Sequence, residues 1–230
     1  MENVIIIGAS GHAKVIVDII EKQNQYRIQG FLDTYKNKGE KLFNYSILGT
    51  EDDLNDIAQQ HGIHGCFIAI GDNYTRKIMA NKISVLNPHI KFINAIHPTA
   101  IIGKKVKFGH GIAIMPGVVI NSDSKIGDFC ILNTNSSLGH DGIMEDYSSI
   151  ASGVRTGGNL MLKECSAISI GATVIENIVI GNDTVIGAGA LVNKNIPNLV
   201  VAYGVPAKII RSRNADDKYL FSEKKCLSKI

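Results

Sequence analysis

A six-residue repeat between about Ile96 and Ile196 constrains the fold more than any other feature of the sequence. Every sixth residue from Ile96 to Val192 is large and apolar in sixteen of seventeen positions, and Thr156 is the one exception. A period of six matches neither an α-helix nor a long strand, but it suits a strand of about five residues followed by a tight corner. Three such units make a triangular coil of roughly eighteen residues, so the repeat predicts a parallel β-helix with the large residues inside.

The first twenty residues have a different pattern. An apolar run from Val4 to Ile7 leads into the glycine turn Gly8–Lys14, and Val15, Ile16, Ile19 and Ile20 then follow at helical spacing. This order indicates a strand, a turn and a helix, whose free N–H groups and positive dipole end suit a phosphate or diphosphate. Ala13 stands where a dinucleotide fingerprint would have a further glycine, so the turn alone is weak evidence.

Two more strands are expected over Ile28–Leu32 and Cys66–Ile70, with helices over Glu51–Gln60 and Tyr74–Leu86. Alternating strands and helices predict a small parallel sheet, whose ligand crevice lies beyond the carboxyl ends of the strands. The residues that follow these ends are Gly8 to Ala13, Asp33 with Thr34, and Gly71. We expect these three turns to converge at one edge of the sheet.

Composition limits the classes of function. With 24 basic and 21 acidic residues the net charge is +3, which gives no strong case for a nucleic acid or a membrane surface as partner. The first apolar run is too short and too interrupted to span a membrane, and it lacks a basic start and a cleavage site, so a cytoplasmic protein is the default. The four cysteines are widely spaced, and we expect reduced thiols rather than disulfides or metal ligands.

Within the repeat, the residues that attract attention as chemical groups are His140 and Asp141. Leu138 is an inward residue, so His140, two places on, is expected to project outward at a strand end or corner. Histidine transfers protons near neutral pH, and an adjacent carboxylate makes it more basic by stabilising the imidazolium. An outward His–Asp pair therefore favours a catalytic role over a structural one.

The segments GASGH, FLD, IAIGDN, LNTNSSLGHD and GVPAK together resemble the sugar acetyltransferases of the bacillosamine and sialic-acid pathways. The resemblance covers about residues 3 to 210. It implies a left-handed β-helix, a homotrimer with the cofactor between neighbouring prisms, and acetyl-CoA as co-substrate without a metal. It also implies that His140 is the general base for direct acetyl transfer to a sugar amine or hydroxyl, with Asp141 raising its basicity.

The resemblance also implies which residues of this sequence contact the two substrates. Nucleotide-sugar contacts fall on Gly11, His12, Ala13, Asp33, Thr34 and Gly71. Acetyl-CoA contacts fall on Ser149, Ile170 and Ala188, of which the last two are eighteen residues, or one coil, apart. Ser149 stands where N-acetylating members can carry a second histidine. Four basic residues are candidates for the phosphates of the cofactor: Arg155, Lys163, Lys208 and Arg211.

The sequence therefore predicts three parts: a Rossmann-like nucleotide-sugar-binding domain over residues 1–90, a β-helix acetyltransferase domain over 91–212, and a tail over 213–230. The expected activity is N-acetylation of a nucleotide-linked 4-amino-4,6-dideoxy sugar, with UDP favoured. O-acetylation of sialic acid or a related sugar hydroxyl is the alternative.

Three other classes fit less well. A zinc enzyme requires converging histidines, whereas His97, His110 and His140 do not share a corner register. A nicotinamide oxidoreductase would use the glycine turn but would give the β-helix no function. A non-catalytic scaffold would not require the His–Asp pair.

Overall fold

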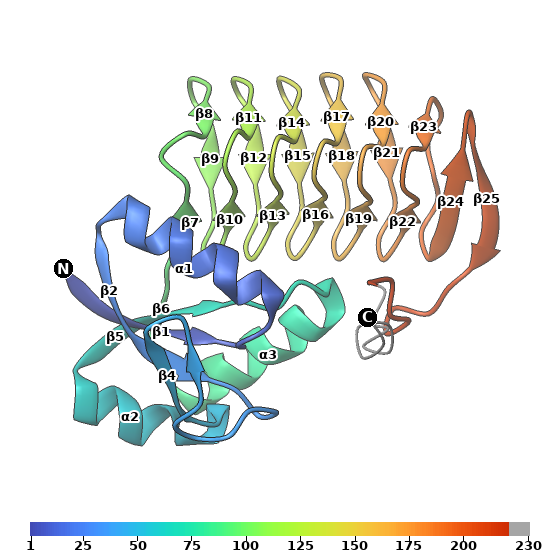
Figure 1. Cartoon of the computed structure of the whole chain (residues 1–230). Coiled ribbons are helices and arrows are strands. Elements are labelled where there is room, and N and C mark those ends of the chain that lie inside the picture. Colours follow the sequence, from blue (N-terminus) through green and yellow to red (C-terminus); the bar gives the residue numbers. More distant parts are fainter. Residues whose placement is uncertain (221–230) are drawn as a thin grey trace, which may run out of the picture.

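The computed structural model describes residues 1–220, which form an α/β domain and a long three-sided prism of stacked coils (Figure 1). The α/β domain contains a six-stranded sheet in the order β3-β4-β2-β1-β5-β6, parallel except between β3 and β4. Its elements are β1 (Glu2–Ile7), α1 (Gly11–Gln23), β2 (Tyr26–Leu32), β3 (Lys41–Leu42), β4 (Tyr45–Gly49), α2 (Leu54–His61), β5 (Ile63–Ile68), α3 (Asn73–Leu86) and β6 (Lys91–Phe92). The three predicted strands thus form the centre of the sheet.

The edges of this sheet differ from expectation. The β3–β4 hairpin and the short edge strand β6 were not predicted from the sequence. Thr50 and Asp53 form a capping box at a 3₁₀ turn, Glu51–Asp53, and helix α2 follows directly from Leu54. Helix α3 begins at Asn73, where the carboxylate of Asp72 accepts the N–H of Thr75 at 2.9 Å.

The prism consists of two-residue strands separated by corners, and strands eighteen residues apart pair in parallel register, as Ala113 does with Ile131. We call the three sides the first, second and third face. The first face contains β7 (Ala95–Ile96), β10 (Ala113–Ile114), β13 (Ile131–Leu132), β16 (Ser149–Ile150), β19 (Ala167–Ile168) and β22 (Val185–Ile186). The second contains β8 (Ile101–Ile102), β11 (Val119–Ile120), β14 (Ser137–Leu138), β17 (Arg155–Thr156), β20 (Thr173–Val174) and β23 (Leu191–Val192). The third contains β9 (Lys107–Phe108), β12 (Lys125–Ile126), β15 (Ile143–Met144), β18 (Met161–Leu162) and β21 (Val179–Ile180).

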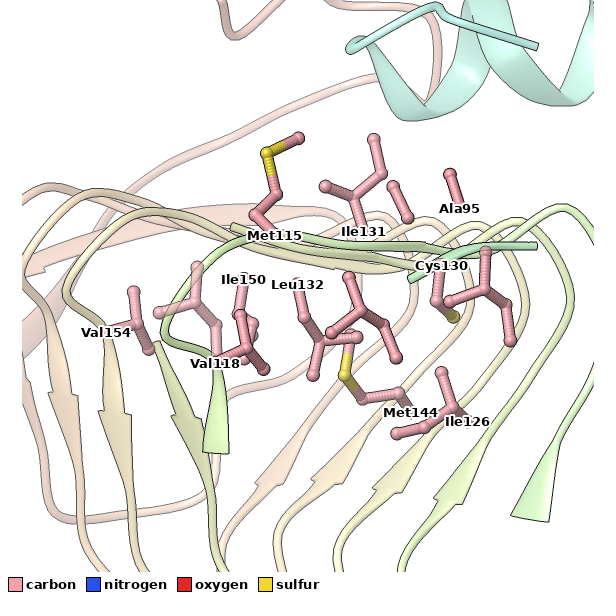
Figure 2. Close-up of a cluster of buried hydrophobic side chains, with 14 of the residues drawn as sticks. Ala95, Met115, Val118, Ile126, Cys130, Ile131, Leu132, Met144, Ile150 and Val154 are labelled. Atoms are coloured by element: carbon pink, nitrogen blue, oxygen red, sulfur yellow. The ribbon is translucent and has the colours of Figure 1, made fainter. Parts of the chain in front are cut away.

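The inward residues of the repeat form the core of the prism. Leu132, Met144 and Ile150 are at most 1% exposed and point into the interior, as Figure 2 shows. Met115 and Ile131 point the other way from the same wall and are buried outside the prism. They belong to one apolar cluster with residues of α1, including Ile16 and Ile20. The α/β domain therefore covers the outer side of the first face.

A hairpin of β24 (Val200–Gly204) and β25 (Ala207–Ser212) closes the prism, and the chain then turns back toward α3 (Figure 1). Arg213 anchors this return by donating to the carbonyl oxygens of Asp183 and Asp217. Residues 213–220 contain a turn but no helix. The rest of the predicted tail, with Cys226, lies outside the described residues.

Candidate active site

A pocket of about 490 Å³ lies between the α/β domain and the first face of the prism. The α/β domain contributes His12 and Gly71, and the prism contributes Ser149, Ile170 and Ala188. All five were predicted from the sequence, two as contacts of the sugar nucleotide and three as contacts of acetyl-CoA. The structure thus brings both predicted groups to one cavity, whose volume suits a small-molecule ligand.

The glycine turn that leads into α1 is held by a carboxylate. Asp33, at the end of β2, accepts the N–H of Ala9 at 2.6 Å and the N–H of Tyr35 at 2.8 Å. Gly8 has a φ of +92°, a conformation that favours glycine, and a β-carbon there would lie 3.3 Å from the carbonyl oxygen of Ala69. Through these two hydrogen bonds, Asp33 joins the glycine turn after β1 to the turn after β2.

Not all predicted nucleotide-sugar residues line the pocket. Gly11 is exposed with open space around it, whereas Ala13 is fully buried in the domain core. Asp33 is buried, and the hydroxyl of Thr34 donates to the carboxylate of Glu51. These four residues lie at the same edge of the sheet as His12 but outside the pocket lining.

His12 presents a neutral imidazole to the pocket. Burial, with a smaller effect of the positive charge of Arg76, lowers the pKa of His12 to about 4. Its Nε2 is buried and has no hydrogen-bond partner among residues 1–220. Because a buried polar atom is normally paired, this nitrogen is suited to bind a polar group of a ligand.

The third turn, at Ile70 and Gly71, is held in place by Arg76 of α3. Arg76 is 1% exposed, and all five of its N–H donors are used. They bond to the carbonyl oxygens of Phe129 (2.8 Å), Ile70 (2.9 Å), Gly71 (3.0 Å) and Tyr147 (3.0 Å) and to Oδ1 of Asn73 (2.7 Å). One side chain therefore joins the pocket turn to the corners of two successive coils.

Neighbouring contacts extend this junction along the prism. Asn73 donates to the carbonyl oxygens of Cys165 (3.2 Å) and Ser166 (3.0 Å), and Lys77 forms an ion pair with Glu164 at 2.6 Å. Cys165 is buried, and burial raises the pKa of its thiol to about 12, so it is an unreactive packing residue.

His140 and Asp141 form the expected pair at the corner after β14. The imidazole Nδ1 lies 2.7 Å from Oδ2 of Asp141, and the His140 side chain is 65% exposed. Asp141 adopts a φ of +57°, and its N–H donates to the carbonyl oxygen of Ser122 at 3.0 Å. With Nδ1 facing a carboxylate, Nε2 is free to accept a proton.

Within one chain, this pair does not line the pocket. Ile170 and Ala188 follow strands of the first face, whereas His140 follows a strand of the second face and lies at its far corner. The separation is about one strand of five residues, on the order of 15 Å.

The predicted phosphate contacts are distributed over the surface. Lys163 is paired with Glu145 at 2.6 Å and Arg211 with Asp217 at 3.3 Å. Arg155 and Lys208 are exposed and form no ion pair with the described residues.

Sequence reasoning missed Tyr219, which lines the pocket from the returning C-terminal segment. Its hydroxyl lies 3.5 Å from the hydroxyl of Ser149, and burial raises the pKa of this phenol. Arg76 was also missed. Arg76 could have been suspected from the sequence, because it is a charged residue beside the apolar positions of a predicted helix. The segment around Tyr219 has no periodicity from which a buried position could be predicted.

Among residues 1–220, no group of three His, Cys, Asp or Glu side chains is placed to hold a metal ion. No helix in this part of the chain is long and apolar enough to cross a lipid bilayer. An α/β domain of Rossmann-like topology followed by a parallel β-helix, with a pocket between them and an exposed His–Asp pair at one corner, defines the fold class of the protein.

The family profile described as PglD N-terminal domain matches residues 3–83. PerB from Caulobacter crescentus, solved with CoA and GDP-perosamine, is 33% identical, with a TM-score of 0.85 over 92% of this chain and 98% of PerB. The acetyltransferase domain of PglB from Neisseria gonorrhoeae, solved with acetyl coenzyme A, is 28% identical, with a TM-score of 0.84 over 91% and 99% of the two chains. The UDP-N-acetylbacillosamine N-acetyltransferase of Bacillus subtilis is 33% identical over 117 residues, 50% of this chain and 52% of that relative.

The chain belongs to the family of nucleotide-amino-sugar N-acetyltransferases that contains PglD and PerB. The predicted fold class, a small Rossmann-like α/β domain followed by a left-handed parallel β-helix, is confirmed. So is the predicted membership of the acetyl-CoA-dependent sugar acetyltransferases.

Proposed function

We propose that the protein transfers the acetyl group of acetyl-CoA to the amine of a nucleotide-linked 4-amino-4,6-dideoxy sugar. The observation that carries this proposal is the pocket in which His12 and Gly71 of the α/β domain face Ser149, Ile170 and Ala188 of the prism. One wall supplies groups for a sugar nucleotide and the other supplies a stacked surface for an extended pantetheine arm. We take UDP as the favoured nucleotide because the curated relative acts on a UDP-linked sugar, and GDP as the next candidate because PerB was solved with GDP-perosamine.

In this mechanism His140 is the general base. Its Nε2 takes a proton from the sugar amine as the amine nitrogen attacks the acetyl carbonyl carbon. The C–S bond then breaks, and the CoA sulfur leaves as a thiolate that takes the proton from the imidazolium and becomes the thiol. Asp141, 2.7 Å from Nδ1, stabilises the imidazolium formed in the first step. General-base catalysis of this kind contributes roughly 10²–10⁴-fold to the rate, and the rest comes from holding the two substrates in place.

The complete site requires a second copy of the chain, and we propose a homotrimer. His140 is exposed and lies about one face away from the pocket of its own chain, so the pair is available to a pocket on a neighbouring prism. Each site then combines the pocket of one chain with the His140 corner of the next. Within this arrangement residues 1–90 bind the sugar nucleotide, residues 91–212 bind acetyl-CoA, and residues 213–220 help to close the pocket.

Of the other predicted contacts, we propose that Gly11 approaches the diphosphate and that Ala13, Asp33 and Thr34 act by shaping the turn around it. Asp33 supports this assignment because its carboxylate already holds the N–H of Ala9. We further propose that the reaction takes place in the cytoplasm.

The test is a thiol-release assay with acetyl-CoA and a panel of UDP-, GDP- and dTDP-linked 4-amino sugars, with sialic acid as a hydroxyl acceptor. We expect turnover with at least one amino sugar and formation of an amide, identified by the mass of the product. Acetylation of sialic acid alone would overturn the N-acetyltransferase assignment in favour of O-acetylation.

A further inference from the structure

Thr156 is the one polar residue among the seventeen inward positions of the repeat. The inward residues of the neighbouring steps, Ile150 and Leu162, are fully buried, whereas Thr156 is only partly buried. A threonine hydroxyl in an apolar interior costs free energy relative to the isosteric valine unless it forms a hydrogen bond. Departures from an otherwise consistent pattern are expected at functional positions, so this residue calls for an explanation.

The hydroxyl of Thr156 accepts the N–H of Gly139 at 3.1 Å. At the equivalent points of the preceding and following coils, the N–H groups of Asn121 and Gly157 donate to the main-chain carbonyl oxygens of Leu138 (3.0 Å) and Val174 (2.8 Å). The N–H of Gly139, the residue before His140, is thus bonded to a side-chain hydroxyl, whereas the equivalent N–H groups of the neighbouring coils are bonded to main-chain carbonyl oxygens.

The strand ladder is interrupted at the same point. Neighbouring pairs on the second face, such as β11 with β14 and β17 with β20, match two residues each, whereas β14 and β17 match only Ser137 with Arg155. The two coils also approach very closely here, because a β-carbon on Gly139 would lie 2.1 Å from the carbonyl oxygen of Gly157. The irregularity is therefore local to the His140 corner.

His140 lies between two anchored N–H groups. On one side, the N–H of Gly139 is held by the hydroxyl of Thr156, and on the other, the N–H of Asp141 is held by the carbonyl oxygen of Ser122. Only the first of these anchors depends on a side chain. A change at position 156 therefore alters the support of His140 without touching the imidazole or its carboxylate partner.

We propose that Thr156 is a positioning residue for the reaction, whose hydroxyl sets the backbone before His140 and so directs the imidazole. This inference rests on the proposed role of His140 as base. Thr156 does not line the pocket, and among the described residues no hydrogen bond joins its side chain to His140 or Asp141, so its effect on the rate passes through the backbone of Gly139.

The test compares kcat and KM of Thr156→Val with those of the wild type. Valine has the same shape and suits an inward position, but it leaves the buried N–H of Gly139 without a partner, so these opposing effects should leave the melting temperature little changed. We expect kcat to fall roughly three- to tenfold, the effect of one hydrogen bond, with KM for both substrates within twofold. Thr156→Ser keeps the hydroxyl and should restore most of the rate. Thr156→Ala removes the same hydroxyl without bulk, and it should lose rate as valine does.

Thr173→Val is the matched control, since Thr173 occupies an outward place one coil further on and has no side-chain hydrogen bond among the described residues. In a His140→Asn background, Thr156→Val should cause no additional loss, because its effect is transmitted through the imidazole. Full kcat in both the valine and alanine variants, or an equal loss in the His140→Asn background, would overturn the proposal. A His140→Asn enzyme with wild-type activity would instead contradict the assignment of the base.

Discussion

Gly158 lies against the imidazole of His140, so close that a β-carbon at this position would be 2.5 Å from both Cε1 and Nε2. The backbone of Gly158 is outside the left-handed region, so alanine is sterically acceptable except for the imidazole, which has to move. A displacement of about 1 Å of a reacting group can cost on the order of 100-fold in rate. The absence of a side chain at position 158 is thus a condition for the observed position of the proposed base.

For Gly158→Ala we expect kcat to fall by roughly 10- to 100-fold, with little change in the melting temperature. Steady-state kinetics on the same batch of protein used for thermal unfolding measures both quantities. Glu176→Ala is the control, because Glu176 is exposed, occupies the equivalent place one coil further on and has a backbone outside the left-handed region. An alanine variant with the kcat of the wild type would show that the imidazole can work from a different position.

Arg76 and Lys77 are adjacent residues that both join α3 to the prism, but they should differ in their effect on stability. Arg76→Ala leaves one buried and several partly buried carbonyl oxygens without their donor, and an unpaired buried group costs about 1–3 kcal/mol. We expect a loss of at least about 3 kcal/mol in the free energy of unfolding. Lys77→Ala breaks a partly exposed ion pair and should cost less than about 1 kcal/mol. Urea unfolding of the two variants at one protein concentration tests this difference, and equal effects would contradict it.

His12 should make the stability of the ligand-free protein depend on pH. The pKa of His12 is about 4 in the folded chain against an ordinary value of 6.5, so the unfolded chain binds more protons between these values. The contribution is lost as the pH falls from about 6.5 toward 4, and by pH 5 it amounts to roughly 2 kcal/mol relative to pH 7. His12→Asn should lose less stability than the wild type over this interval in urea unfolding. Parallel curves for the two proteins would mean that His12 is not the group that titrates.

Tyr219 forms one wall of the pocket while leaving the cavity open, so we expect it to assist binding. Tyr219→Ala should raise KM for at least one substrate several-fold with little change in kcat, and Tyr219→Phe should lie between alanine and the wild type. Lys218→Ala, which changes an exposed neighbour, is the control. A Tyr219→Ala enzyme with a lower KM would show that the tyrosine obstructs the pocket.

The fold was predictable where a regular pattern forces it. An unbroken six-residue period can bury its large residues in one way, so the prism followed from Ile96 to Val192 alone, and the β-α alternation gave the central strands of the sheet. The β3–β4 hairpin and β6 were not predictable, because strands of two to five residues at a sheet edge carry too few residues for a period to be read.

Five residues that line the pocket were named from the sequence, but the arrangement that brings them together was not predictable. His12, Gly71, Ser149, Ile170 and Ala188 line one pocket because α3 packs along the corners of the coils, a long-range contact with no local signature. The same holds for Tyr219, which reaches the pocket only because the chain turns back after β25. The position of His140, one face away from the pocket, follows from the repeat once the pocket is assigned to the first face.

The central claim is that the imidazole of His140 removes the proton from the attacking amine. The most direct measurement is the acetyl-transfer rate of His140→Asn with saturating acetyl-CoA and amino-sugar nucleotide, alongside binding of both substrates by calorimetry. If His140 is the general base, kcat of His140→Asn should fall by about 10²–10⁴-fold, while substrate binding and the melting temperature stay unchanged. A His140→Asn enzyme that retains kcat within threefold of the wild type would contradict it.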